Sequence, residues 1–281
     1  MKLATIRHRD QTLYGQVIGD RFYPVQEALK TRYATLKDLI SDGSLTQLAA
    51  QQTRQEDGID LAKVSFLPPI PEPGKIICVG LNYRKPYPVD GVAPPEPSQI
   101  ILFGKERDAL LGHQQKLETP TGAAAHSFDY EGEIAVIIGT AGRHIAQDDA
   151  MAHVMGYSIF NDGSVRDWQK HSIYAGKNFA GSGSWGPWIT TADEIKDPAT
   201  MSLTTHLNGQ QMQSTTADQM IYSIAAQISY ASHLYNLHPG DIIATGSPDG
   251  TGGSRTPKRY LQEGDRLQIA VSGIGSLQND I

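Results

Sequence analysis

A run of twelve residues, 128–139, most constrains how this chain can fold. Its second half, residues 134–138, is apolar and mostly β-branched, and a glycine follows it, which is typical of a buried strand. Successive side chains of a strand point to opposite faces, so Glu131 and Glu133 should share one face. Two carboxylates this close repel each other and are costly to bury unpaired. A divalent cation would remove that cost.

A third carboxylate, Asp162, ends the next strand-like run, residues 156–162. Carboxylate oxygens are the ligands that hard cations such as Mg²⁺ and Mn²⁺ prefer. Glu131, Glu133 and Asp162 therefore form a candidate metal site. The alternative is that the two glutamates face solvent on an edge strand, which is the commoner origin of an isolated Glu-x-Glu.

The overall composition of the 281-residue chain narrows the class of protein. The formal net charge is -6 and no basic block stands out, so nucleic acid is not expected as a partner. The N-terminus lacks the apolar core of a signal peptide, and no apolar run is long enough to cross a membrane. Cys78 is the only cysteine, which rules out an intrachain disulfide. These features predict a soluble cytoplasmic protein.

The chain divides by pattern into a small N-terminal part, residues 1–66, and a larger part, residues 67–281. The small part has short strand-like and helix-like segments and no recognisable chemistry, which favours a small α+β docking or capping domain. Four prolines between residues 68 and 73 predict an extended linker. A buried strand over residues 75–83 should follow.

The larger part is expected to be mixed β-structure with some helix. Strands are predicted at residues 100–103, 241–246 and 267–271, and a hairpin at residues 203–212 around Asn208 and Gly209. Helices are predicted at residues 147–155 and 218–236, and a tight turn at residues 182–188. The glycine-rich loop at residues 247–253 could hold an anion through its backbone N–H groups.

Several further motifs follow one another along residues 74–279. They are Ile-Cys-Val-Gly-Leu-Asn-Tyr at 77–83, Asp-Tyr-Glu-Gly-Glu at 129–133, Asn-Asp at 161–162, Arg-Asp-Trp-Gln at 166–169, Gly-Lys-Asn-Phe at 176–179, Gly-Pro-Trp at 186–188, Pro-Gly-Asp at 239–241, Thr-Gly-Ser-Pro at 245–248 and Gly-Ile-Gly at 273–275. Together they resemble the fumarylacetoacetate hydrolase family, in its branch of bacterial acylpyruvases and 2-hydroxyhepta-2,4-diene-1,7-dioate isomerases. The resemblance implies a mixed β-roll catalytic domain, a bound Mg²⁺, Mn²⁺ or Ca²⁺ ion, and a homodimer.

The resemblance also implies roles for individual residues. The family's metal ligands fall on Glu131, Glu133 and Asp162, in agreement with the strand argument. Members act on short 2-oxo acids or diketo acids, and their substrate-contacting positions fall on Arg166, Gln169, Lys177 and Thr245. Lys177 is also implied as a catalytic residue, because with Arg166 it would neutralise the negative charge that develops on the substrate.

One segment departs from the family's pattern. Many members carry a histidine and a glutamate just after the Asn-Tyr pair, on a lid, whereas residues 84–90 here read Arg-Lys-Pro-Tyr-Pro-Val-Asp. The prolines of residues 84–97 predict a semi-rigid lid over the metal. Asp90 is the candidate catalytic base on that lid. His113, His126, Glu106 and a hydroxide on the metal are the alternatives.

Three functions are compatible with the sequence. The leading one is a metal-dependent hydrolase that cleaves a carbon–carbon bond of an acylpyruvate-type 2,4-diketo acid in the breakdown of aromatic compounds or sugar acids. The second is an oxaloacetate decarboxylase or keto–enol isomerase on the same scaffold. The third is a metal-binding protein without turnover. The first two share a metal-stabilised enolate, so the sequence predicts the metal but leaves the reaction open.

Overall fold

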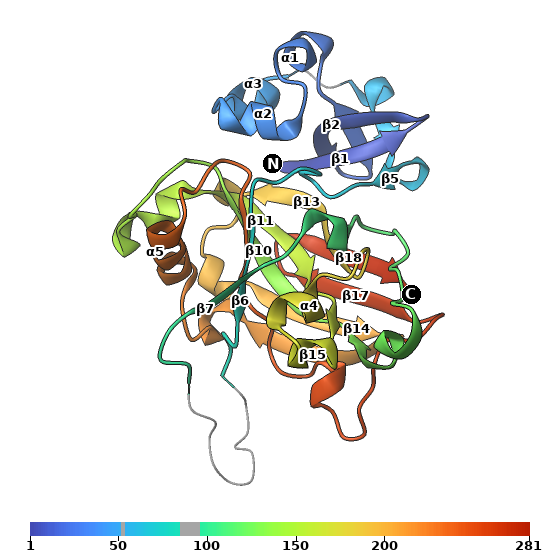
Figure 1. Cartoon of the computed structure of the whole chain (residues 1–281). Helices are drawn as coiled ribbons and strands as arrows, with labels where there is room; N and C mark the ends of the chain where they lie inside the picture. The colour runs from blue at the N-terminus through green and yellow to red at the C-terminus, as the bar shows by residue number, and fades with distance from the viewer. Residues whose placement is uncertain (52–53, 85–95) are drawn as a thin grey trace.

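The computed structural model describes residues 1–51, 54–84 and 96–281. Most of its regular structure is β-sheet (Figure 1). In the described part of the chain a 12-stranded sheet runs through the molecule, and a 4-stranded sheet packs against it. The predicted class, mixed β-structure with some helix, is confirmed.

The large sheet combines strands from both ends of the chain. Its main path runs β4 (Ile59–Asp60), β3 (Arg21–Pro24), β2 (Gln11–Ile18), β1 (Lys2–His8), β13 (Gly183–Thr191), β11 (Val154–Asn161), β10 (Gly132–Ile138), β16 (Ile242–Ala244), β6 (Ile76–Gly80) and β7 (Ile101–Gly104). The short strands β5 (Ser65–Phe66) and β8 (Leu110–Leu111) pair with β1 and β13.

The remaining elements surround this sheet. The small sheet has the order β15 (Gln210–Thr216), β14 (Ser202–Leu207), β17 (Arg266–Val271) and β18 (Gly275–Asp280), and β9 (Phe128–Asp129) pairs with β12 (Ser164–Val165). The α-helices are α1 (Glu27–Arg32), α2 (Leu36–Ser41), α3 (Leu45–Ala49), α4 (Ile173–Lys177) and α5 (Ile224–Leu234). No helix of the described residues has the length and apolar character that a membrane span requires.

The N-terminal strands are joined to the larger part by direct strand pairing. Lys2 lies opposite Thr190 and Leu3 opposite Ile189, so β1 to β4 extend the large sheet beyond β13. Helices α1 to α3 gather at the same end of the molecule (Figure 1). The strands and helices predicted in this part are present, whereas a domain boundary at residue 66 stays a prediction.

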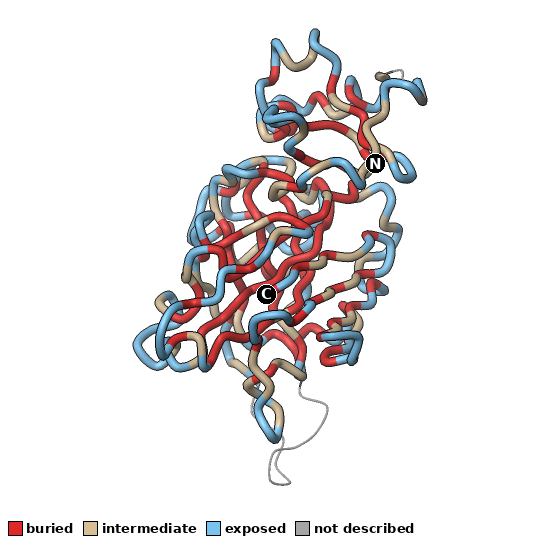
Figure 2. Tube along the Cα trace, turned by 90° about the vertical axis from the view of Figure 1, so that its right-hand side faces the viewer, coloured by how far each residue is buried: buried red, intermediate tan, exposed pale blue. Residues whose placement is uncertain are grey.

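Strand β10 is central in the fold and is buried along its whole length. It pairs with β11 on one side and with β16 on the other. The side chains of Ile134, Val136 and Ile138 face one hydrophobic cluster. Those of Ala135 and Ile137 face a second. Figure 2 shows this buried interior in red. Because side chains alternate, Glu131 and Glu133 point to the same side as Ala135 and Ile137.

The predicted turn at residues 182–188 is wrong, because these residues lie in or next to strand β13. Gly183 allows a close approach of two strands and does not form a turn. A Cβ on Gly183 would stand only 2.7 Å from the carbonyl oxygen of Asn161 on the neighbouring strand β11.

The two helices predicted from sequence also differ from the structure. Residues 147–153 form a 3-10 helix, and β11 begins directly after it. Helix α5 begins only at Ile224, where the Ser223 side chain caps it. The backbone just before the helix is bound to Asn82 instead. The N–H of Ile221 donates to the Asn82 carbonyl, and the N–H of Tyr222 donates to Asn82 Oδ1.

Candidate metal centre and its pocket

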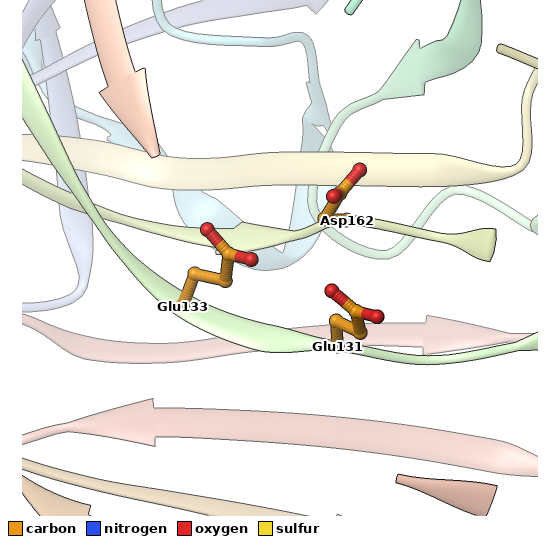
Figure 3. A group of neighbouring side chains, drawn as sticks. All are labelled: Glu131, Glu133 and Asp162. Carbon is orange, nitrogen blue, oxygen red and sulfur yellow. The ribbon is translucent and has the colours of Figure 1, made fainter. Parts of the chain in front are cut away.

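Three carboxylates meet where β10 and β11 lie side by side (Figure 3). Glu131, Glu133 and Asp162 each offer one oxygen, and these atoms lie within 4.8 Å of one another. The register explains the meeting, because Gly132 is opposite Asn161 and the Asp162 N–H donates to the Glu131 carbonyl at 2.9 Å. The structure therefore brings together the three predicted ligands, whose role in binding a metal stays a prediction.

Glu133 is a buried carboxyl group that forms no ion pair with a described residue. Its Oε2 accepts a hydrogen bond of 2.9 Å from the N–H of Gly246, whose φ of +98° favours glycine. Burial, and then the charges of Asp162 and Glu131, raise the pKa of Glu133 well above its ordinary value. Such a group fits a site that a divalent cation completes, since the cation would compensate its negative charge.

Two buried lysines stand against the same carboxylates. Lys177 Nζ lies 2.7 Å from Glu131 Oε2 and 2.6 Å from Asp162 Oδ2. Burial alone would lower the pKa of Lys177, but the charges of Asp162 and Glu131 raise it above its ordinary value. Lys105 Nζ lies 2.7 Å from Asp162 Oδ1. Lys177 is therefore a buried cation paired with two of the three carboxylates, and its catalytic role stays a prediction.

Lys105 is a site residue that the sequence analysis missed. It follows strand β7, and its fully buried ammonium also donates to the carbonyls of Gly163 and Lys177. A lone lysine after an apolar strand gives no signal of this role, because its partners lie far away in the sequence. Lys105 fixes the Asp162 side chain and the end of helix α4 at once.

We expect Lys105→Met to lower the free energy of unfolding by about 3–5 kcal/mol, because it leaves a buried carboxylate oxygen without its cation. Denaturant unfolding measures this loss. The control is Lys116→Met, at a lysine whose side chain is 62% exposed, and it should change stability by less than about 0.5 kcal/mol. Equal stability of the two variants would mean that Lys105 does not support the cluster.

Arg166 connects the carboxylates to the open part of the pocket. Its Nε lies 2.8 Å from Asp129 Oδ2, and its Nη1 donates to Glu131 Oε1 and, at 3.5 Å, to Gln169 Oε1. Its buried Nη2 has no hydrogen-bond partner among the described residues. An unpaired buried N–H of a cation is costly, so this atom is suited to an anionic ligand.

Thr245 is placed differently from the other predicted substrate contacts. It is fully buried, and its hydroxyl donates to the Ile134 carbonyl at 3.0 Å. It is not among the residues that line the pocket. A contact between Thr245 and a substrate therefore stays a prediction.

A pocket of about 360 Å³ opens beside the carboxylates. Its lining combines the charged residues with an apolar wall and part of the glycine-rich loop: Val79, Gly80, Leu81, Tyr83, Ile101, Phe103, Glu131, Arg166, Gln169, Ile173, Lys177, Ser247, Pro248, Asp249, Thr251 and Ser254. None of these described lining residues is a histidine. A concave site with few polar groups on apolar walls is typical of small-molecule binding.

The three side chains that are alternatives to the predicted base are not among the residues that line this pocket. His113 is buried, its Nδ1 accepts from the Gln278 N–H, and burial lowers its pKa to about 4. His126 lines a different pocket, next to Lys258, and Glu106 accepts a hydrogen bond from Tyr174. Asp90, the predicted base, lies outside the described residues, as does most of the predicted lid.

The sequence and the structure each have known counterparts. The family profile described as fumarylacetoacetate (FAA) hydrolase C-terminal matches residues 75–281. The chain belongs to the fumarylacetoacetate hydrolase family. The matched range covers the metal-centre residues, the cations and the pocket.

Individual family members extend the similarity to the whole chain. Oxaloacetate tautomerase YisK of Bacillus subtilis is 34% identical over 301 residues, which is 100% of both chains. A fumarylacetoacetate hydrolase structure from Exiguobacterium antarcticum has a TM-score of 0.85 and 31% identity, covering 100% of this chain and 99% of that one. Maleylpyruvate hydrolase from Sphingobium sp. SYK-6, in complex with manganese and pyruvate, has a TM-score of 0.80 and 29% identity over 100% and 98% of the chains.

Proposed function

We propose that this family member is a divalent-metal-dependent enzyme that interconverts the keto and enol forms of a short 2-oxo acid, with oxaloacetate as its substrate. The observation that carries the proposal is the buried carboxylate cluster, which stands beside Lys177 and an unpaired Arg166 N–H in a small pocket. The similarity to an oxaloacetate tautomerase over the full length of both chains supports the choice of reaction.

The charges around the pocket support a dication and an anionic substrate. Glu131, Glu133 and Asp162 would hold the ion, which when bound acts as a Lewis acid toward the substrate's oxygens. Among the buried and partly buried groups alone, apart from the exposed Asp249 of the pocket lining, the carboxylates of Asp129 and the three proposed ligands stand against three cations, Lys105, Lys177 and Arg166. With all four of these carboxylates ionised, a dication would change the excess of one negative charge within this cluster into an excess of one positive charge, which favours binding of an anion there.

The protein's hydrogen-bond donors match the carboxylate and the 2-oxo oxygen of a 2-oxo acid. Arg166 Nη2 is free to bind the carboxylate, and the amide N–H groups of Gln169 can orient it. Lys177 directs two of its three protons at Glu131 and Asp162, so the third remains for the oxygen on which enolate charge develops. Its raised pKa keeps Lys177 protonated, so it acts as a donor and not as the base.

Tautomerisation requires fewer catalytic groups in this pocket than hydrolysis does. It moves one proton between a carbon and an oxygen, whereas hydrolysis also needs a group that activates water. The described pocket lining contains no histidine for that task. The role of Asp90 as the base stays a prediction.

Hydrolysis of an acylpyruvate is the second candidate. It is favoured by the similarity to the maleylpyruvate hydrolase whose structure contains manganese and pyruvate. Both reactions pass through an enolate of a 2-oxo acid, so the same Lys177 and Arg166 contacts serve either one.

The experiment is a direct comparison of products with manganese-loaded protein. We expect the enol absorbance of freshly dissolved oxaloacetate to relax at least about a hundredfold faster than without enzyme, with no release of carbon dioxide. Release of pyruvate and a second acid from acylpyruvates, without faster enol relaxation, would select the hydrolase. Activity on neither substrate would leave a metal-binding protein without turnover.

A further inference from the structure

Asp129 is a fully buried carboxylate that the proposed reaction does not use. Its two oxygens accept four hydrogen bonds. Arg166 Nε and the N–H of Gly253 donate to Oδ2, both at 2.8 Å, and the N–H groups of Gly252 and Tyr130 donate to Oδ1 at 2.8 and 2.9 Å. Four donors fill the accepting capacity of a carboxylate, so Asp129 has no room for a metal or a ligand.

These bonds connect Arg166 to the glycine-rich loop, residues 247–253. Arg166 lines the pocket, and so do Ser247, Pro248, Asp249 and Thr251 of the loop. The sequence suggested that the loop could hold an anion, and two of its N–H groups hold the chain's own Asp129 carboxylate. A Cβ on Gly252 would stand 2.1 Å from the Arg259 carbonyl oxygen and 2.6 Å from Asp129 Oδ1, so only glycine fits there.

Asp129 also determines how Arg166 presents its free nitrogen. The guanidinium is planar, and two of its nitrogens are held, Nε by Asp129 and Nη1 by Glu131. Holding two atoms of a rigid plane fixes the direction of the third, Nη2, which has no partner among the described residues. Without Asp129, the guanidinium could turn about its last side-chain bonds and follow Glu131 alone.

We propose that Asp129 is a positioning residue, which aims Arg166 Nη2 at the carboxylate of a bound 2-oxo acid and anchors the glycine-rich loop that lines the same pocket. This inference rests on the proposed function, because it assigns Arg166 to the substrate carboxylate. It goes beyond that function, because it assigns the N–H groups of Gly252 and Gly253 to the carboxylate of Asp129 and not to an external anion.

The test uses oxalate, a small dicarboxylate, titrated calorimetrically into manganese-loaded protein. Asp129→Asn keeps the size of the side chain, but its amide N–H₂ must face two of the four donors in either orientation. We expect the Kd for oxalate to rise about tenfold or more, while the Kd for manganese rises by a smaller factor, because Asp129 contacts none of the three proposed metal ligands. The matched control is Asp265→Asn, because Asp265 is also buried and accepts from an arginine and other donors, but none of these donors lines the pocket.

A double-variant cycle separates positioning from general loss of structure. If Asp129 acts through Arg166, adding Asp129→Asn to Arg166→Gln should cost no further oxalate affinity. Fully additive losses would overturn the inference. Gly253→Ala supplies a second variant, because its Cβ would press on Asp129 Oδ2 at 3.2 Å and on Arg166 Nε at 3.4 Å. It should weaken oxalate binding by a smaller factor, and this result decides the matter if Asp129→Asn does not fold.

Measurements on the wild-type protein distinguish a failure of the role of Asp129 from a failure of the proposed function. If manganese-loaded wild type binds oxalate and both Asp129→Asn and Gly253→Ala bind it equally well, the role of Asp129 is refuted and the proposed function stands. If the wild type binds no oxalate and does not act on oxaloacetate, the proposed function fails, and the role of Asp129 fails with it.

Discussion

Glu133→Gln should greatly weaken the binding of manganese and yet leave the metal-free protein at least as stable as the wild type. The glutamine keeps the shape of the side chain and can still accept the hydrogen bond from the N–H of Gly246. It removes one of three carboxylates that would hold the cation, and we expect the affinity to fall by about a hundredfold or more, since even residues that only support metal ligands cost 10–100-fold.

The stability of the metal-free variant follows from the raised pKa of Glu133. A carboxyl group whose pKa is higher in the folded than in the unfolded protein opposes folding once the pH exceeds the unfolded value, because its ionised form is the disfavoured one in the fold. This penalty grows as the pH rises toward the folded pKa. Glutamine carries no such penalty, so at neutral pH the variant should unfold at the same or a higher temperature than metal-free wild type.

Thermal unfolding with and without manganese measures both effects together. At a free metal concentration of about a hundred times the Kd, binding should stabilise the wild type by about 2.7 kcal/mol. This increment should disappear in Glu133→Gln. The control is Glu263→Gln, at a glutamate whose side chain is 86% exposed, and it should keep the increment. Retention of wild-type manganese affinity by Glu133→Gln would refute the metal centre.

The parts of this site that could be predicted from sequence are those that local pattern controls. Alternation along a strand is a property of the backbone, so it placed Glu131 and Glu133 on one face without any knowledge of the fold. Asp162 followed because consecutive strands tend to be neighbours, and β10 and β11 do pair. Lys177 and Arg166 were reached only through the family resemblance.

The parts that could not be predicted depend on contacts between distant residues. Lys105 lies 57 residues before Asp162, and nothing in its own neighbours reveals that pairing. Asp129 holds N–H groups more than 120 residues away, so the glycine-rich loop looked free to bind an external anion. The late start of helix α5 has the same cause, because Asn82 binds the backbone of Tyr222 across 140 residues. Tertiary contacts of this kind override local pattern.

Lys177→Met should have the opposite signature to Glu133→Gln, with metal binding retained and turnover lost. The substitution removes a fully buried ammonium that lies 2.6–2.7 Å from Asp162 and Glu131. Without this cation the carboxylates are more negative, so manganese should bind as tightly as in the wild type or more tightly. The enolate oxygen, however, loses a preorganised donor. Removal of one such donor typically lowers kcat by about a hundredfold to a thousandfold.

The assay is the kcat for oxaloacetate enol relaxation, measured together with the manganese Kd of the same preparation. Lys170→Met is the matched control, because Lys170 lies only seven positions away, is 77% exposed and pairs with Asp167 outside the pocket lining. It should keep both values within about twofold, as surface substitutions usually do. If Lys177→Met also kept kcat, its ammonium would serve only to balance the buried carboxylates. If it lost manganese binding together with kcat, the lysine would act by supporting the metal centre, and the role of donor to the enolate would have to be abandoned.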